Sequence, residues 1–537
     1  MKKRNKFFSL LLSLALGVLA ALPLLFSKLS LLSFLVYIPF FIRLFRLTDV
    51  KIKTYYLHGL FFFQGYLMAA FSFFIAMYPL EFAGLGIPAA VSVILAATVL
   101  LPLFQGCFLA LSCLIFGLFK KWGLTSAPIT SSLTAAALIS LSFFFQNFTW
   151  AGVPWASPAV SLAYSPVLIG SASLLGSGFL TFLLLFVNAL LAEGFIAFRA
   201  CKDKAALLSL ALALGLFCTN LFYGLIAVGQ MPKEEGETIT VALIQSYAPV
   251  KDGVSIADEL ETGEALAAQA ADMADVDVMI WPESIIPHAL ERDKSNQTFF
   301  SLVARETGAI QLIGSFSEQV DEGNIVHFYN SIFAFYPDGS MSEEKYNKRR
   351  PVPFGEYLPM AKLFGTVIPA LTEINMLSRD TQAGEGANLF HLPFGNVGGL
   401  LCFDSIYPAL SRESVLEGAA LLVLPTNDSW FDGSAAKDIH FAHAVLRAVE
   451  NRRTVVRVGD TGLSGVILPN GEVKDVLPRD EAAVAISTVT LYEDISVYTR
   501  IGDAAEAVLL AYLILYPTIA LCIKHKKKGD HKNHDRI

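Results

Sequence analysis

The most constraining feature of this 537-residue chain is a series of long apolar runs in its first half. Seven of them occur between Phe7 and Val228, at about 7–26, 30–46, 56–78, 90–119, 127–147, 167–197 and 204–229. An eighth, from Ala505 to Ile523, precedes a basic tail. Each is long enough to cross a hydrocarbon core about 30 Å thick as a helix. The sequence therefore predicts an α-helical membrane bundle of eight spans, seven N-terminal and one C-terminal.

Basic residues between the runs predict the orientation of the bundle. They occur in "MKKRNK", between Arg43 and Lys53, at Lys120–Lys121 and in the C-terminal tail, whereas the loops "YPLEFAGLGIP" and "FTWAGVPWASPAVSLAYSP" contain none. Because basic loops stay in the cytoplasm, seven crossings place residues 231–503 on the other side of the membrane. The alternative of a cleaved signal peptide at 7–26 is disfavoured, since six more spans follow without an exported domain between them.

Changes in composition along the sequence divide the chain into four parts. Residues 1–230 form the N-terminal transmembrane domain, residues 231–503 a domain of short strands, turns and mixed charges, residues 504–524 a C-terminal transmembrane helix, and residues 525–537 a basic cytoplasmic tail. The net charge of −7 averages unlike parts and gives no support for nucleic-acid binding. No extra interaction module appears, so we expect a monomer.

Residues 231–503 have the pattern of a layered α/β domain. Strands are predicted at 240–247, 276–282, 309–316, 330–337, 397–404, 420–425, 454–459 and 464–469, with helical patterns notably at 255–274 and 437–452. Strands as apolar as these are covered on both faces. A domain of about 270 residues can bury a substantial core.

Three strand ends in this domain carry reactive side chains. "MIWPES" ends with Glu283 after a buried strand, "YNKRRPVPFGEYLP" contains Lys348 and Glu356, and "LLCFDS" contains Cys402. A carboxylate, an ammonium and a thiol suit nucleophilic catalysis. The carboxylate would take the thiol proton, the thiolate would attack an acyl carbon, and the ammonium would stabilise the oxyanion.

Each of these residues also has a simpler interpretation. A lone cysteine after an apolar run can be a buried filler, Glu283 a surface charge or helix cap, and Lys348 one of several basic residues that meet lipid phosphates. A single cysteine in this domain excludes an internal disulfide and a zinc site of cysteine ligands. His440 and His443 with Asp438 hint at a metal site, but "AAKDIHFAHAVLRAVENRR" is better explained as a helix with packed or capping histidines. We therefore expect no metal and no cofactor.

Several segments, in this order, resemble the nitrilase (carbon–nitrogen hydrolase) superfamily: "WPES", "YNKRRPVPFGEYLP", "LLCFDS", "NDSWFDGS" and "HFAHAVLRAVENRRTVVRVGDTGLSGVILPNG". With seven spans before them and one after, the whole chain resembles the bacterial apolipoprotein N-acyltransferase family. The resemblance implies an αββα sandwich outside the cytoplasm. It also implies Glu283 as general base, Lys348 as oxyanion partner and Cys402 as nucleophile.

The same resemblance suggests supporting residues. Glu356 matches a second glutamate that keeps the lysine charged and oriented, the backbone N–H of Phe403 would complete the oxyanion hole, and Trp281 matches a tryptophan that usually precedes the base. Two departures stand out. Phe403 and Asp404 replace a tyrosine and a glutamate, and "GDTG" at Gly459–Gly462 replaces "NNG" or "NRTG". Asp404 keeps the charge but has a shorter reach.

The resemblance implies a ping-pong reaction at the periplasmic face of the bacterial inner membrane. Cys402 would take an acyl chain from a phospholipid as a thioester and pass it to the α-amino group of an S-diacylglyceryl-cysteine apolipoprotein, the last step of lipoprotein maturation. One alternative is a membrane-tethered nitrilase-like amidase, which requires no lipid-facing segments. A transporter is disfavoured, because strongly polar residues in the middle of the spans, such as Gln105 and Asn188, are few.

Two further segments suggest contact with lipid. In "PMAKLFGTVIPALTEINML" apolar residues that include Leu363 and Phe364 recur at helical spacing, which predicts an amphipathic arm in the outer leaflet. A helix packed on the core of the domain is the alternative. Trp150 and Trp155 suit a membrane–water interface and are predicted to flank a lipid entrance.

Overall fold

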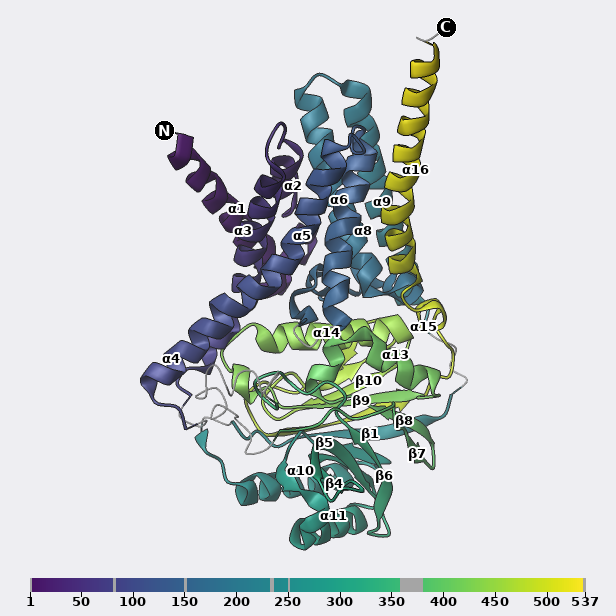
Figure 1. The fold of residues 1–537 in the computed structure, drawn as a ribbon. Coiled ribbons are helices and arrows are strands. Elements are labelled where there is room, and N and C mark those ends of the chain that lie inside the picture. The colour runs from purple at the N-terminus through teal and green to yellow at the C-terminus, as the bar shows by residue number, and fades with distance from the viewer. Residues whose placement is uncertain are drawn as a thin grey trace.

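A helical bundle stands on an α/β sandwich in the computed structural model of the protein (Figure 1). The structure describes residues 2–80, 84–148, 152–231, 236–249, 252–357 and 380–534. Both ends of the described chain lie at the side of the bundle away from the sandwich, and the last helix, α16, runs alongside the bundle (Figure 1). The sandwich is thus inserted between the N-terminal helices and α16.

The bundle is built from α1 (Lys2–Leu25), α2 (Ile38–Phe45), α3 (Ile52–Ala70), α4 (Ile87–Leu95), α5 (Leu101–Lys121), α6 (Pro128–Phe144), α7 (Pro166–Ile169), α8 (Ala172–Arg199), α9 (Asp203–Gly229) and α16 (Ala504–His534). Within the described ranges, seven helical stretches are long and apolar enough to cross a membrane, as judged by length and composition. The predicted run at 56–78 forms α3 and the short helix η2 (Ser72–Met77) and is not among the seven.

Helix α3 nevertheless packs tightly within the bundle. A Cβ atom on Gly17 of α1 would lie 1.9 Å from the carbonyl oxygen of Phe62, and one on Gly65 of α3 would lie 2.1 Å from that of Leu14. Only glycine fits at either position, and small residues of this kind allow the backbones of membrane helices to approach closely. The close contact between α1 and α3 therefore depends on this pair of glycines.

The predicted run at 30–46 is broken rather than continuous. It forms the 3₁₀ helix η1 (Ser27–Phe34), which is followed by α2. Asn188 of α8 is fully buried beside the break, where its Oδ1 accepts from the backbone N–H of Tyr37 at 3.1 Å and its Nδ2 donates to the carbonyl of Ser33 at 3.0 Å. Buried backbone groups released by a helix break need such partners in an apolar surrounding. Asn188 thus stabilises the break, which accounts for this polar residue without a transport site.

The first sheet of the sandwich has seven strands. Its path runs in the order β13–β1–β2–β4–β5–β6, and β3 pairs with β4 off this path. Strand β1 is parallel to β2, and β2 to β4, whereas β13, β5 and β6 pair antiparallel with their neighbours. The bounds are β1 (Thr238–Gln245), β2 (Val278–Ile280), β3 (Ile286–Ala289), β4 (Ile310–Val320), β5 (Val326–Phe335), β6 (Met341–Asn347) and β13 (Ala483–Thr490).

The second sheet has six strands in the order β12–β11–β10–β9–β8–β7. Its centre, β8–β9–β10, is parallel, so the carboxyl ends of these three strands lie at one edge. The bounds are β7 (Phe390–Leu392), β8 (Gly395–Gly399), β9 (Leu421–Thr426), β10 (Val455–Gly459), β11 (Gly465–Ile467) and β12 (Val473–Lys474).

Helices cover the outer faces of the two sheets. Aliphatic side chains of both sheets, among them Leu243 and Val423, pack against each other between the sheets. On the first sheet, α10 (Ile256–Met273) and α11 (Lys294–Thr307) bury a second cluster that includes Trp281. On the second sheet lie α13 (Pro408–Leu416) and α14 (Ala436–Asn451), between the sheet and the bundle (Figure 1). The domain is therefore an αββα sandwich.

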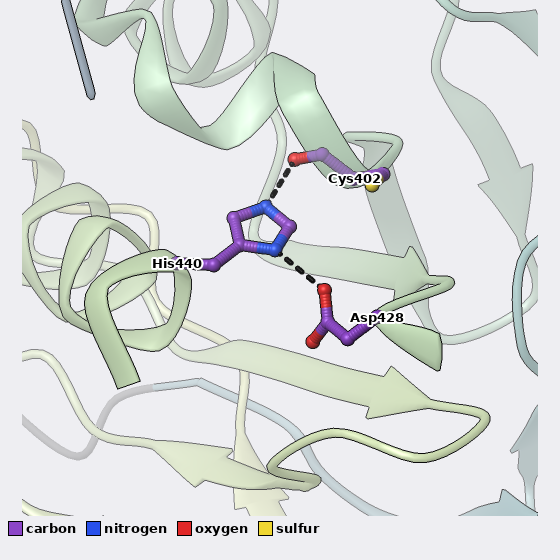
Figure 2. A group of neighbouring side chains, drawn as sticks. All are labelled: Cys402, Asp428 and His440. Atoms are coloured by element: carbon purple, nitrogen blue, oxygen red, sulfur yellow. Dashed lines mark hydrogen bonds and ion pairs between the residues drawn. The ribbon is translucent and has the colours of Figure 1, made fainter. Parts of the chain in front are cut away.

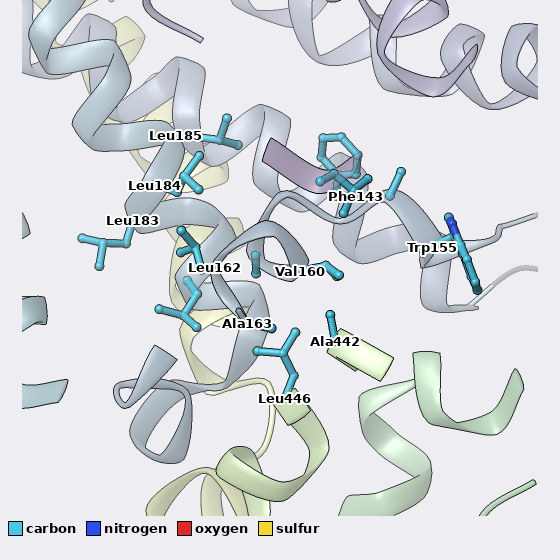
Figure 3. Packing of buried hydrophobic residues seen from close by; sticks show 14 of the residues in the cluster. Phe143, Trp155, Val160, Leu162, Ala163, Leu183, Leu184, Leu185, Ala442 and Leu446 are labelled. Atoms are coloured by element: carbon cyan, nitrogen blue, oxygen red, sulfur yellow. The ribbon is translucent and has the colours of Figure 1, made fainter. Parts of the chain in front are cut away.

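Helix α14 joins the sandwich to the bundle. Its residues Ala442 and Leu446 belong to one hydrophobic cluster with Val160 and Leu184 of the membrane half, and they point toward those residues in Figure 3. One turn further along, Glu450 Oε1 accepts from the backbone N–H of Ser177 at 2.8 Å. Because α14 has the sheet on one side and the bundle on the other, it is buried along nearly its whole length.

Candidate active site

The three reactive side chains that the sequence singled out meet at strand ends. Glu283 follows β2, Lys348 directly follows β6, and Cys402 begins the 3₁₀ helix η11 (Cys402–Ile406) shortly after β8. All three are buried, with exposed fractions of 4%, 2% and 9%. Ligand sites in α/β domains form where loops leave the carboxyl ends of strands, which is where these residues lie.

Lys348 makes two ion pairs. Its Nζ lies 2.8 Å from Glu283 Oε1 and 2.9 Å from Glu356 Oε2. Burial opposes the charge of the ammonium, but the two carboxylates outweigh this effect and raise the pKa of Lys348 well above its ordinary value. The ammonium is therefore a fixed positive charge within the site.

Both glutamates are held by further donors. Asn330 Nδ2 donates to Glu283 Oε1 at 2.8 Å and to Glu356 Oε1 at 2.9 Å, so one amide connects the two carboxylates. The backbone N–H of Asn427 donates to Glu283 Oε2 at 2.9 Å, and that of Val352 to Glu356 Oε2 at 2.6 Å. Sequence analysis did not single out Asn330 or Asn427. The sequence does carry a signal for Asn427, because it is a polar residue at a strand end, as are Glu283, Lys348 and Cys402.

The Cys402 thiol is neutral at rest. Burial raises its pKa well above the ordinary value, the charges of Glu283 and Asp428 raise it further, and Lys348 only partly offsets them. A neutral thiol is a weak nucleophile and needs a base within reach, and Glu283 lies near enough for its charge to act on this thiol. The arrangement can therefore deliver a thiolate to an acyl carbon, with Lys348 close by to stabilise negative charge.

The supporting residues lie in three different settings. Trp281 is fully buried in the cluster between the first sheet and helices α10 and α11, where its Nε1 donates to Gln311 Oε1 at 2.8 Å. Phe403 is half-buried, stacks edge-on against Tyr407 and packs on the cluster shared with the bundle. Asp404 has no exposed surface and accepts hydrogen bonds from Tyr346 of β6, from Arg350 shortly after this strand and from Leu401. The Asp404 carboxylate thus has a structural role, and its short side chain fits this buried position.

His440 and His443 do not pair with Asp438, contrary to the hint of a metal site. Asp438 forms an ion pair with Arg479, and His443 Nε2 donates to the carbonyl of Trp155 at 3.1 Å. His440 instead lies between Asp428 and Cys402, with Nδ1 2.8 Å from Asp428 Oδ1 and Nε2 2.9 Å from the Cys402 carbonyl oxygen (Figure 2).

Cys402, Asp428 and His440 form the one cluster of potential metal ligands found among the described residues. Both ring nitrogens of His440 already have protein partners, and Asp428 Oδ2 accepts from Arg457 Nη2 at 2.5 Å. A metal ion would have to displace these contacts. Hydrogen bonds within the protein therefore explain why His440 and Asp428 lie together.

The predicted lipid-facing segments are only partly described. Leu363, Phe364 and Trp150 lie outside the described residues. Trp155 is 3% exposed, and its ring lies 5.8 Å from that of His440, so it packs between the bundle and α14 rather than at an open interface.

Known proteins match both halves of the chain. The family model described as carbon–nitrogen hydrolase matches residues 240–495, and the one described as apolipoprotein N-acyltransferase N-terminal domain matches residues 16–190. An apolipoprotein N-acyltransferase of Geobacter metallireducens is 32% identical over 363 residues, which cover 67% of this chain and 68% of that protein. Apolipoprotein N-acyltransferase 1 of Treponema denticola is 26% identical over 98% of this chain and 100% of that protein. Among solved structures, an amidase of Nesterenkonia sp. is 17% identical with a TM-score of 0.37, over 52% of this chain and 97% of that one.

Proposed function

Because this chain belongs to the apolipoprotein N-acyltransferase family, we propose that it moves a fatty acyl chain from a phospholipid to the N-terminal α-amino group of an S-diacylglyceryl-cysteine apolipoprotein. The acyl chain is carried between the two substrates on Cys402 as a thioester. The observation that supports this most directly is the buried Lys348 ammonium, which lies between Glu283 and Glu356 next to the thiol.

In the first half-reaction, Glu283 takes the proton of the Cys402 thiol and the sulfur attacks the carbonyl carbon of the phospholipid ester. Lys348 and the backbone N–H of Phe403 stabilise the oxyanion. The C–O bond to the glycerol oxygen then breaks, and Glu283 returns the proton to that oxygen. A lysophospholipid leaves and the acyl thioester remains.

In the second half-reaction, the α-amino group of the apolipoprotein attacks the thioester carbon. The amine loses a proton to Glu283, the C–S bond breaks, and the amide forms while Cys402 regains its thiol. An amine opens a thioester readily, whereas hydrolysis would waste the donor. Water therefore has to be excluded from the site, and the low exposure of all three side chains is consistent with this need.

The proposed membrane arrangement has eight spans, with α3 as the additional crossing. Its tight contact with α1 supports that assignment. We place residues 1–230 in the N-terminal membrane domain, 231–503 in the catalytic domain, 504–524 in the last span and 525–537 in the cytoplasm. The catalytic domain then lies on the periplasmic side of the inner membrane, in a monomer that needs no nucleic acid or cofactor.

Lipid access is proposed to depend on the arm that contains Leu363 and Phe364. Aspartate at both positions would add charge to the apolar face of an arm in the outer leaflet. We expect the double variant to lose phospholipid-dependent acylation while it keeps the fold of the domain. Normal acylation by this variant would contradict lateral entry through the arm.

Mass spectrometry of the purified protein tests the reaction. After incubation with phospholipid alone, we expect an acyl adduct on Cys402, and addition of a diacylglyceryl peptide should remove the adduct and acylate the peptide. Cys402→Ala should give no adduct. The matched control is Cys201→Ser, since Cys201 is an exposed thiol at the end of α8 and its loss should change nothing.

Two outcomes would contradict the proposal. An adduct that appears equally in Cys402→Ala would assign the nucleophile to another residue. Absence of any acyl adduct in the wild-type protein, together with ammonia release from small amides, would favour a membrane-tethered amidase instead.

A further inference from the structure

The proposed nucleophile has a backbone conformation that is unfavourable for its residue type. Cys402 has φ = +46°, in the left-handed region that residues with a side chain rarely adopt. Such a conformation is strained and persists only where the surrounding structure enforces it. Something must therefore hold the turn at residue 402.

Two side chains hold the carbonyl group of this residue. The oxygen accepts from His440 Nε2 at 2.9 Å and from Ser405 Oγ at 2.8 Å. A carbonyl oxygen only accepts, so Nε2 of His440 carries the proton in this contact. Ser405 belongs to the same short helix as Cys402, whereas His440 comes from α14 and ties the turn to the rest of the domain.

His440 itself is held from several directions. Its Nδ1 lies 2.8 Å from Asp428 Oδ1, and Asp428 Oδ2 accepts from Arg457 Nη2 at 2.5 Å. His440, Asp428 and Arg457 are at most 1% exposed. The ring also lies 5.8 Å from that of Trp155 in the membrane half. The imidazole is thus a fixed donor rather than a mobile one.

The geometry separates this histidine from a general base. In Figure 2 the carbonyl oxygen of Cys402 points at the imidazole, and the two ring nitrogens are engaged by this oxygen and by Asp428. The sulfur lies within 4.8 Å of a ring nitrogen, but no hydrogen bond joins the two within the described part of the chain. Glu283 acts on the thiol instead, because its charge adds to burial in raising the pKa of Cys402. The contact between His440 and Cys402 therefore acts on the backbone and not on the thiol.

The peptide bond between residues 402 and 403 connects this contact to the oxyanion hole. In a planar trans peptide, the carbonyl of Cys402 and the N–H of Phe403 point in opposite directions within one plane. A donor that fixes and polarises the carbonyl therefore also fixes and polarises the N–H. In the proposed function that N–H stabilises the oxyanion.

We propose that His440 is a positioning residue that holds the peptide between Cys402 and Phe403, so that the thiol faces Glu283 and the N–H faces the oxyanion. The inference rests on the proposed function, in which Cys402 is the nucleophile. Loss of the Nε2 donor should slow thioester formation on the order of 10- to 100-fold, because the oxyanion donor would be misdirected. The KM for phospholipid should stay unchanged, since both ring nitrogens are engaged by protein groups, Asp428 and the Cys402 carbonyl.

A pair of conservative variants separates positioning from general stability. His440→Gln places an amide nitrogen near the position of Nε2 and can still donate to the Cys402 carbonyl. His440→Asn places its amide nitrogen near the position of Nδ1, so it keeps the contact with Asp428 and loses the one with Cys402. We expect His440→Gln to retain most of the single-turnover acylation rate and His440→Asn to lose at least tenfold, with similar unfolding temperatures.

The matched control is His443→Asn, one turn along the same helix. His443 contacts the Trp155 carbonyl and not the nucleophile, so this variant should acylate at the wild-type rate. Equal rates for His440→Asn and the wild type, or equal losses for His440→Asn and His440→Gln, would overturn the positioning role. No adduct on the wild-type protein in the same experiment would instead overturn the proposed function.

Discussion

Lys348 Nζ lies 2.9 Å from Glu356 Oε2, and this ion pair is additional to the one that Lys348 forms with Glu283. The ammonium is buried, so each carboxylate contributes strongly to keeping it charged. Glu356 therefore acts on the lysine, while the charge of Glu283 acts on both the lysine and the thiol.

We expect Glu356→Gln to slow acylation of Cys402 by on the order of 10- to 100-fold. The amide keeps the shape but removes one of the two charges that raise the pKa of Lys348 against burial. That pKa should fall, so the ammonium would be lost at a lower pH and the alkaline limb of the rate–pH profile should move toward neutral pH. Single-turnover acylation measured across a pH series checks this.

The control for this prediction is Glu413→Gln. Glu413 pairs with the buried Arg349, but 52% of the Glu413 side chain is itself exposed, so solvent screens its charge and it should matter little for the site. An alkaline limb that does not move in Glu356→Gln would show that Glu356 does not set the charge of Lys348.

Asp404 should prove essential for stability. It is fully buried and accepts from the N–H of Leu401 at 3.1 Å, the N–H of Arg350 at 2.8 Å and the hydroxyl of Tyr346 at 2.8 Å. Asp404→Ala leaves these donors unpaired, at about 1–3 kcal/mol for each buried group. Asp404→Glu adds a methylene group where no space is available and should cost about 1–3 kcal/mol.

Thermal unfolding in detergent measures both effects. Tyr346→Phe is the matched control, because it removes one donor without leaving the others unpaired, and it should lower the unfolding temperature least. A wild-type unfolding temperature for Asp404→Ala would contradict the bridging role of this carboxylate.

Local sequence patterns predict the site residues that directly follow a recognisable strand. Glu283, Lys348 and Cys402 each follow an apolar or alternating strand, and polar residues at strand ends are typical of sites. The partners of Asp404 and His440 could not be predicted in this way. Asp438 is close to His440 in sequence, but the partner in the fold is Asp428, at the end of another strand.

The contrast between local and long-range signals also explains the errors in the predicted strands and helices. The central strands are apolar on both faces and were predicted within a few residues. The polar strand β6 and the half-exposed strand β13 lie at sheet edges, where the apolar pattern fades, and they were missed. The break near Ser33 depends on Asn188, which is 155 residues away, so no local pattern reveals it.

The buried ion pair between Arg447 and Glu450 should be required for docking of the sandwich on the bundle. Arg447 Nη2 lies 2.9 Å from Glu450 Oε2, and Glu450 Oε1 accepts from the N–H of Ser177 in the membrane half. Both side chains are at most 1% exposed. Glu450→Ala leaves the guanidinium buried without its partner, so we expect a loss of about 3–5 kcal/mol in unfolding free energy.

Arg479→Ala provides the comparison, since it removes the ion pair with Asp438, whose two side chains are 49% and 34% exposed, and should cost less than about 1 kcal/mol. Denaturant unfolding of both variants in detergent measures the difference. Similar small losses for the two would show that the contact between Glu450 and Ser177 does not contribute to docking.

Asp460 should make the protein less stable as the pH rises. Burial raises the pKa of this carboxyl well above its ordinary value, and the charges of Asp428 and Glu259 raise it further. The folded state therefore keeps a proton that the unfolded chain releases at about pH 3.9. The stabilising contribution is complete below that pH and is lost progressively as the pH rises toward the raised pKa.

Asp460→Asn removes this dependence, because an amide resembles the protonated acid and cannot ionise. Its Oδ1 can still accept from the backbone N–H groups of Asp428 and Thr461, at 3.0 Å and 2.8 Å in the wild type. We expect the variant to match the wild type in acid and to exceed its unfolding free energy by a margin that grows toward neutral and alkaline pH. Asp272→Asn, at an exposed position of α10, should follow the wild-type curve. Parallel curves for Asp460→Asn and the wild type would mean that Asp460 is not the group whose proton couples to folding.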